Sequence, residues 1–353
     1  MIEIDGSYGE GGGQILRTAV SLSALTMRPV RINNIRAGRP KPGLKKQHIA
    51  GIEVTGKIVG AEVRGLEVGS TSVEFVPRER VGGKISYDVG TAGSVSLVLQ
   101  AALPPAVLSP EPISFDLRGG TDVKWSPPVD YLHNVFAHTL EILGPRIEVV
   151  QKRRGHYPKG GGLVNCDVTP VDSIKPLDSI EFGSLRSVRG VSHCVRLPGH
   201  IAERQAASAE EMILQQLKIK SDIIRESYRK EEDRHLGPGS GIVVWAESDK
   251  GFRVGADSLG ERGKSAERVG AAAASQLIAE VSTGMAVDSH LCDMLIPYLA
   301  IADGDSKIGV SEVTSHLVTN IWAVKLILGT EIELEGSIGE SGTVSVKGEG
   351  LSL

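Results

Sequence analysis

Residues 141–168, EILGPRIEVVQKRRGHYPKGGGLVNCDV, end a helical pattern at Gly144 and then alternate as strands do. Two other stretches share this design: 57–77, KIVGAEVRGLEVGSTSVEFVP, and 326–348, LILGTEIELEGSIGESGTVSVKG. Glycine just past the last helical turn is a common stop because it takes a left-handed conformation readily. Alternation of apolar and polar residues is typical of paired strands. Each stretch therefore predicts a helix followed by paired strands.

The spacing of these stretches predicts a threefold repeat with one interruption. Gly60 and Gly144 are 84 residues apart, whereas Gly144 and Gly329 are 185 apart, which is 101 more than one period. Three units of about 85 residues, with about 100 extra residues inserted in the third, account for both spacings. Chance similarity of helix-hairpin junctions is the alternative reading of this spacing.

The inserted segment has the pattern of a small α/β domain. A strand is expected at 190–198, a helix at 202–218, a further strand at 242–246 and an alanine-rich helix at 266–281. The charged run 225–234 is interpreted as a solvated face without a ligand.

Six predicted helix N-termini are candidate anion sites. We call Gly60, Gly144 and Gly329 the marker glycines. The residues thirteen positions before them are Gln47, Tyr131 and His316, which lie early in three equivalent helices. Each unit also has an earlier helix, opening near Gly13, Ser94 or Ser289–Leu291. Helix N-termini carry free N–H groups and a partial positive charge, which suit phosphates.

Composition restricts where a polyanion can bind. The 353 residues carry a formal net charge of −4, so the chain is not globally basic, and any such site is a local patch. The clearest patch has seven cations and no acid between positions 28 and 46: Arg28, Arg31, Arg36, Arg39, Lys41, Lys45 and Lys46. A solvated basic loop is the alternative reading of this patch.

The three cysteines are widely spaced, and C-x-x-C is missing from the sequence, so a zinc ribbon or a disulfide framework is not expected. The N-terminus lacks a signal-peptide profile, and no apolar stretch is long enough for a bilayer span. These features predict a cytoplasmic protein.

Residues 9–17, GEGGGQILR, are a candidate phosphate-binding turn. Glycines let a backbone approach a phosphate closely, Glu10 can hold a divalent ion, and Arg17 lies one turn into the following helix. The alternative is a flexible strand-helix turn. A second candidate is the proline-stiffened loop 35–44, where Arg36 and Arg39 can fork onto phosphate oxygens.

The most distinctive string is RGHYPKGGGLV at 154–164. Together with GEGGGQILR, IRAGRPKPGL, GTAGSVSLVLQ and SHLVTNI, it resembles the RNA 3'-terminal phosphate cyclases over essentially the full length. The resemblance implies an α+β fold built of α/β repeats: three units of a four-stranded sheet backed by two helices, as in enolpyruvyl transferases, plus a smaller inserted α/β domain. We expect the core at 1–183 and 284–353, with units at about 1–80, 81–168, and 169–183 plus 284–353. The inserted domain is then 184–283.

The resemblance also implies a three-step reaction. A histidine attacks the α-phosphorus of ATP and releases pyrophosphate, and the AMP then passes to an RNA 3'-phosphate to give RNA(3')pp(5')A. The vicinal 2'-OH attacks that phosphorus, giving a 2',3'-cyclic phosphate and AMP. By this resemblance the cosubstrate is ATP, the partner is an RNA 3'-phosphate end, and a divalent cation, Mg or Mn, is expected to neutralise the leaving group.

Carried onto this sequence, the resemblance assigns the nucleophile to His316, whose neutral imidazole can attack phosphorus near pH 7. Glu10 is the expected metal contact. The remaining assignments are nucleotide contacts at Gln100 and at His290, Leu291, Cys292, Asp293 and Met294, and RNA-end phosphate contacts at Arg17, Arg36, Arg39 and Gln47. The chain departs from its bacterial relatives at His290 and Met294, where those have Tyr and Gln.

Two other functions compete with this one. A non-catalytic cyclase-like protein of ribosome assembly would share the fold but lack the histidine, so His316 favours the enzyme. An enolpyruvyl transferase would share the repeat, but IRAGRPKPG and His316 argue against it. The sequence leaves a homo-oligomer open.

Overall fold

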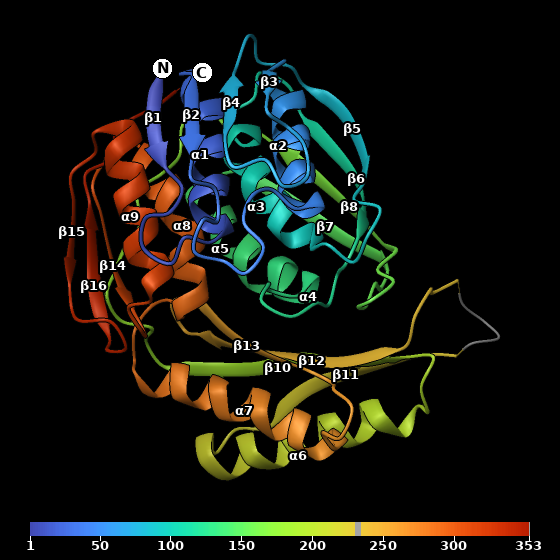
Figure 1. Cartoon of the computed structure of the whole chain (residues 1–353). Coiled ribbons are helices and arrows are strands. Elements are labelled where there is room, and N and C mark those ends of the chain that lie inside the picture. Colours follow the sequence, from blue (N-terminus) through green and yellow to red (C-terminus); the bar gives the residue numbers. More distant parts are fainter. Residues whose placement is uncertain (230–233, 353) are drawn as a thin grey trace.

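The computed structural model describes residues 1–229 and 234–352. Three four-stranded sheets and their helices form one body, and a fourth four-stranded sheet with two helices lies against it (Figure 1). The expected α+β architecture of α/β repeats is confirmed.

The first unit runs through residues 2–76 in the order strand, helix, strand, helix, strand, strand. Its sheet has the order β1-β2-β4-β3, in which β1 and β2 are parallel and the other pairs antiparallel. Its elements are β1 (Ile2–Asp5), α1 (Gly13–Thr26), β2 (Val30–Asn33), α2 (Lys46–Ile58), β3 (Glu62–Arg64) and β4 (Val73–Val76).

The second unit repeats this order, but its second helix is interrupted by a π-helical turn. Its sheet order is β5-β6-β8-β7, again with one parallel pair at the start. The elements are β5 (Gly83–Asp88), α3 (Val95–Ala106), β6 (Ile113–Gly119), α4 (Val129–Tyr131), η1 (Leu132–Ala137), α5 (His138–Leu143), β7 (Arg146–Arg153) and β8 (Gly162–Thr169).

The third unit is split in sequence. Its first strand precedes the insertion and its other elements follow it, yet the sheet closes as β15-β16-β14-β9. The elements are β9 (Asp178–Ser179), α8 (Ser289–Ile301), β14 (Ser306–Val310), α9 (Ser315–Leu328), β15 (Ile332–Glu335) and β16 (Gly342–Val346).

Between β9 and α8 lie a sheet of order β11-β10-β12-β13 and two helices that pack on it. These elements are β10 (Leu185–Val195), α6 (His200–Leu217), β11 (Ser221–Tyr228), β12 (Gly239–Ser248), β13 (Arg253–Leu259) and α7 (Ala266–Ser282). The sequence did not predict β11 or β13. The charged run 225–234 begins on β11, and its residues 230–233 lie outside the described part of the chain.

The marker glycines end their helices as expected. Gly60, Gly144 and Gly329 have φ of 50°, 125° and 82°, which lie in the region that favours glycine over other residues. Gln47 and His316 are each the second residue of a helix, and Tyr131 is the third residue of α4. The register inferred from the spacing is therefore confirmed.

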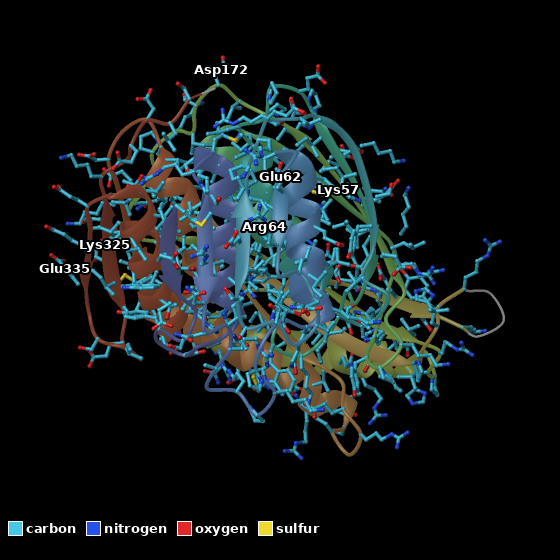
Figure 2. The ribbon with its side chains drawn as sticks, turned by 45° about the horizontal axis from the view of Figure 1, so that its top comes forward. Lys57, Glu62, Arg64, Asp172, Lys325 and Glu335 are labelled. Atoms are coloured by element: carbon cyan, nitrogen blue, oxygen red, sulfur yellow. The ribbon has the colours of Figure 1, made fainter. Side chains whose placement is uncertain are left out.

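Helices of the three units pack together at the centre of the body, where α1 contacts α2, α3 and α9 (Figure 1). The shared core is mainly aliphatic; Leu22 of α1 is fully buried and contributes roughly 2 kcal/mol by burial. Charged side chains such as Lys57, Arg64 and Lys325 are exposed on the outside of this body (Figure 2). The Ser315 hydroxyl donates to Glu10 before α1, Gly13 lies beside His48, and the Ser94 amide donates to Gln47, so the N-termini of α9, α1, α2 and α3 lie near one another in turn.

The three cysteines, Cys166, Cys194 and Cys292, are buried and free. Within residues 1–229 and 234–352, no helix combines the length and the apolar character that a bilayer crossing requires.

Candidate functional site

His316 stands in the first turn of α9, and its side chain is 47% exposed. Thr314 caps this helix, since its Oγ1 accepts a hydrogen bond from the Leu317 amide at 2.9 Å. The same hydroxyl donates to Oδ1 of Asp293 at 2.7 Å, which ties the start of α9 to α8. The imidazole is thus held at a rigid helix end while staying accessible.

Glu10 links His316 to the basic loop. Its Oε2 lies 3.7 Å from Nδ1 of His316 and 3.7 Å from Nη2 of Arg39. Oε1 accepts a hydrogen bond from the Ser315 hydroxyl. The glycine-rich turn, the basic loop and the start of α9 therefore converge as the sequence predicts, and Glu10 is a carboxylate placed where a cation could bind beside the histidine.

The electrostatic surroundings keep the His316 ring neutral. Partial burial lowers its pKa below 6.5, and the cations Arg17 and Arg39 act in the same direction, while Glu10 opposes them. A neutral imidazole at pH 7 has a free lone pair on one ring nitrogen. The ring can therefore act as a nucleophile without a separate strong base.

A polar pocket lies between α1, α3, α8 and α9. Its lining includes Arg17, Gln100, Asp293 and Met294, four of the predicted site residues. Burial raises the pKa of Asp293 to about 8 and lowers that of Arg17 to about 10. Nε of Arg17 is buried without a hydrogen-bond partner among the described residues, so this guanidinium has donor capacity left for a ligand.

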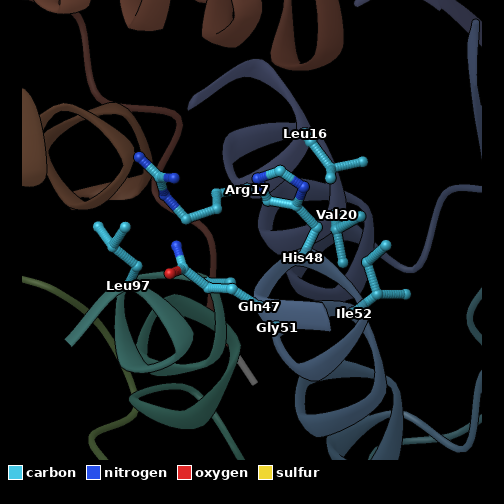
Figure 3. Close-up of a pocket in the computed structure, with 9 residues that line it drawn as sticks. Leu16, Arg17, Val20, Gln47, His48, Gly51, Ile52 and Leu97 are labelled. Carbon is cyan, nitrogen blue, oxygen red and sulfur yellow. The ribbon is translucent and has the colours of Figure 1, made fainter. Parts of the chain in front are cut away.

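Arg17 also lines a neighbouring pocket between α1, α2 and α3, together with Gln47 and His48 (Figure 3). Oε1 of Gln47 accepts a hydrogen bond from the Ser94 amide at 2.9 Å, which joins α2 to the start of α3. Gln47 therefore also has a structural role, since it satisfies a backbone donor at the α3 N-terminus.

The sequence did not predict that His48 lies at this site. Its Nδ1 accepts a hydrogen bond from the Lys45 amide at 3.1 Å, and burial lowers its pKa to about 3, with Arg17 and Arg36 adding to the effect. Its imidazole ring is therefore neutral and lies close to Arg17 and Arg36. The available signal was its position in the first turn of α2, directly after Gln47.

Arg36 has a different position from the other arginines. It is 7% exposed, and its Nη1 donates to the carbonyls of Lys41 at 2.7 Å and Gly43 at 2.9 Å. These bonds fix the path of the basic loop. Arg39, in contrast, is 43% exposed in its side chain, so a ligand can reach it where it faces Glu10.

The stretch 290–294 separates into exposed and buried positions. His290 is exposed and lies close enough to His316 to lower its pKa. Leu291 and Cys292 are fully buried, so they offer no side-chain surface to a nucleotide. Asp293 faces the polar pocket, where the amide of Asn320 donates to its backbone carbonyl at 2.7 Å.

Comparisons with known proteins cover nearly the whole chain. A family model described as RNA 3'-terminal phosphate cyclase matches residues 8–334. A protein of that name from Methanopyrus kandleri is 56% identical over 350 residues, which cover 99% of each chain. Its namesake from Ignicoccus hospitalis is 52% identical over 349 residues, again 99% of each chain. The one from Thermococcus gammatolerans is 53% identical over 345 residues, 98% of this chain and 97% of that one.

Proposed function

The chain belongs to the RNA 3'-terminal phosphate cyclase family and is an ATP-dependent enzyme that cyclises RNA 3'-phosphate ends, and we propose that His316 carries the adenylyl group in this reaction. The relatives named above are cyclases, neither enolpyruvyl transferases nor non-catalytic cyclase-like proteins. The observation that carries the proposal is an accessible, neutral imidazole at a helix N-terminus beside Glu10 and Arg39.

The orientation of His316 favours Nε2 as the attacking atom. Nδ1 lies toward Glu10, so a proton on Nδ1 is stabilised by the carboxylate and the lone pair remains on Nε2. Nε2 forms a bond to the α-phosphorus of ATP, and the bond to the bridging oxygen breaks to release pyrophosphate. The 3'-phosphate of the RNA then displaces the imidazole, and the 2'-OH displaces AMP, losing its proton as the cyclic phosphodiester forms.

Phosphate groups are proposed to bind between the N-termini of α1 and α9. Arg17 and Arg39 supply guanidinium donors there, and both helix ends supply free N–H groups. Gln47 is proposed as a further RNA-end contact, and Arg36 is proposed to act by fixing the loop that carries Arg39.

The nucleotide is proposed to bind beside the polar pocket between α1, α3, α8 and α9, whose volume of about 20 Å³ leaves room for little more than one water molecule. Gln100 and Asp293 supply the polar contacts, Met294 an apolar wall, and His290 a ring at the exposed side. Leu291 and Cys292 contribute only by packing and backbone position. Asp293 also orients α9 through its bond to Thr314.

A divalent cation, Mg or Mn, is part of the proposal. Its carboxylate ligand is Glu10, whose hard oxygen donor suits either ion. A cation bound there would neutralise part of the negative charge that develops on the departing pyrophosphate.

The proposal extends to domain organisation and location. We propose a core of residues 1–183 and 284–353 and an inserted domain of residues 184–283, because a complete sheet with its own helices lies between β9 and α8. Three free cysteines agree with a reducing cytoplasm.

Incubation with ATP labelled at the α-phosphate tests the proposal. The full chain should acquire an acid-labile, alkali-stable label and release pyrophosphate, while His316→Ala should acquire none. His133→Gln, a change at another exposed histidine, is the matched control and should label normally. A labelled adduct in His316→Ala, at a level like that of the control, would assign the adenylyl group to another residue.

A further inference from the structure

Three buried side chains from distant parts of the sequence converge where the inserted sheet meets the second unit. Asp122 follows β6, His156 follows β7, and His193 lies on β10. One ligand atom from each lies within 4.8 Å of the others. Nε2 of His193 is 3.6 Å from Oδ1 of Asp122, and the two imidazole rings are 5.2 Å apart between centroids.

This cluster is buried and incompletely hydrogen-bonded. Asp122, His156 and His193 are 2%, 5% and 1% exposed. Neither ring nitrogen of His193, nor Nε2 of His156, has a hydrogen-bond partner in the described part of the chain. Leaving a buried polar atom unpaired costs about 1–3 kcal/mol. Each of the two rings therefore has a nitrogen available to a shared ligand.

The charges around the cluster point to a cation. Arg154 pairs with Asp122 at 3.4 Å, Asp130 at 2.7 Å and Glu226 at 2.7 Å, so one guanidinium faces three carboxyl groups. The carboxyl groups therefore outnumber the one guanidinium that pairs with them.

The donor set suits a transition-metal dication. Neutral imidazole nitrogens and a carboxylate oxygen bind zinc at about 2.0–2.2 Å, which places tetrahedral ligands roughly 3.3 Å apart. The 3.6 Å separation of His193 and Asp122 is close to that value. We propose that Asp122, His156 and His193 form a binding site for one zinc-type dication, with a water molecule as the fourth ligand. This site shares no residue with the one assigned to Glu10.

The position of the site indicates a structural role. Asp122 and His156 belong to the second unit, and His193 belongs to the sheet inserted between β9 and α8. A shared ion would therefore fasten this sheet to the core. The inserted sheet packs tightly against His156. A Cβ at residue 239 of β12 would lie 2.1 Å from Cγ of His156, so only glycine at this position leaves room for the imidazole ring.

Metal titration of the chelator-stripped full-length protein tests this site. We expect one equivalent of Zn²⁺ to bind and to raise the Tm by several degrees. One equivalent of Co²⁺ should give the intense visible absorption of a tetrahedral complex. His193→Gln and Asp122→Asn should each lose the Co²⁺ spectrum and the Zn²⁺-dependent rise in Tm. His200→Gln, a change at an exposed histidine of the inserted segment, should keep both.

Two further measurements make the outcome decisive. Circular dichroism of His193→Gln and Asp122→Asn reports whether each variant is folded, and Glu10→Gln separates this site from the proposed cation site of the reaction. Stoichiometric Co²⁺ binding that persists in Glu10→Gln supports the inference. Wild-type protein that binds neither ion, folded site variants that bind as wild type does, or binding that is lost in Glu10→Gln would each overturn it.

Discussion

Nδ1 of His316 lies 3.7 Å from Oε2 of Glu10, although the two residues are separated by almost the whole length of the chain. The contact joins the glycine-rich turn before α1 to the first turn of α9. It places two groups beside Oε2 of this carboxylate, the proposed nucleophile and the guanidinium of Arg39. Catalysis by His316 should therefore depend on both pH and charge at this position.

The pH dependence of adenylylation should have its acidic limb below pH 6.5. Partial burial lowers the pKa of His316, so the reactive neutral ring predominates at pH 7 and is lost as the pH falls through this lowered pKa. Single-turnover formation of the labelled adduct from pH 5 to 8 measures the limb. NMR titration of the His316 ring checks that the limb belongs to this group; a limb centred above pH 6.5 contradicts the assignment.

Glu10→Gln should weaken the cation dependence of adenylylation. The substitution keeps the size of the side chain but removes the charge that would hold Mg or Mn, so we expect a rate loss on the order of a hundredfold and a higher cation requirement. The measurement is the adenylylation rate as a function of cation concentration. Glu67→Gln, at another exposed carboxylate, should leave both quantities unchanged. An unchanged cation requirement in Glu10→Gln would place the ion elsewhere.

Arg17→Lys should slow the transfer of AMP to the RNA 3'-phosphate by roughly 10–100-fold. A lysine retains the charge but loses the planar fork, and hydrogen bonds to charged groups contribute about 1.5–3 kcal/mol each. The rate constant and the half-saturating RNA concentration are measured in single turnovers of the adenylylated enzyme, with Arg64→Lys as the exposed control. Equal values for the two variants would remove Arg17 from the phosphate site.

Asp293→Asn should change how stability depends on pH. Burial raises the pKa of Asp293 from 3.8 to about 8, so the native state binds a proton that the unfolded chain has released between these values. Wild-type stability should therefore fall as the pH rises from 4 to 8, by on the order of a few kcal/mol. The variant should lose much of this slope, as measured by denaturant unfolding at pH 5 and pH 8. Parallel slopes in the two proteins would contradict the raised pKa.

The repeat could be predicted from sequence because its signals are local. A glycine that ends a helix and the alternating strands after it are visible in a short window, and Gly60, Gly144 and Gly329 carry them. The π-helical turn at Leu132–Ala137 could not be predicted, because it lies within an ordinary helical pattern. β13 contains Gly255, Asp257 and Ser258, and β11 contains Asp222, Arg225 and Glu226, so neither gave a clear strand signal.

The candidate site was predictable to a similar degree. The turn containing Glu10, the basic loop and the segment with His316 each have a recognisable composition, and the structure brings Glu10, Arg39 and His316 together. A run of cations does not reveal that Arg36 turns inward to bind backbone carbonyls. Nor does any linear motif join Asp122, His156 and His193, which meet only after the inserted sheet has packed on the core.

The split third unit constrains the order of events on the ribosome. β9 leaves the exit tunnel well before its sheet partner β14, and residues 184–283 must be made between them. At about 5–20 residues per second, synthesis of that segment takes roughly 5–20 s. The first two units can fold during this time, whereas β9 has no partner strand until β14 has been made. A nascent chain halted before β14 should thus contain three complete sheets, those of the first two units and of the inserted segment, and only β9 of the fourth.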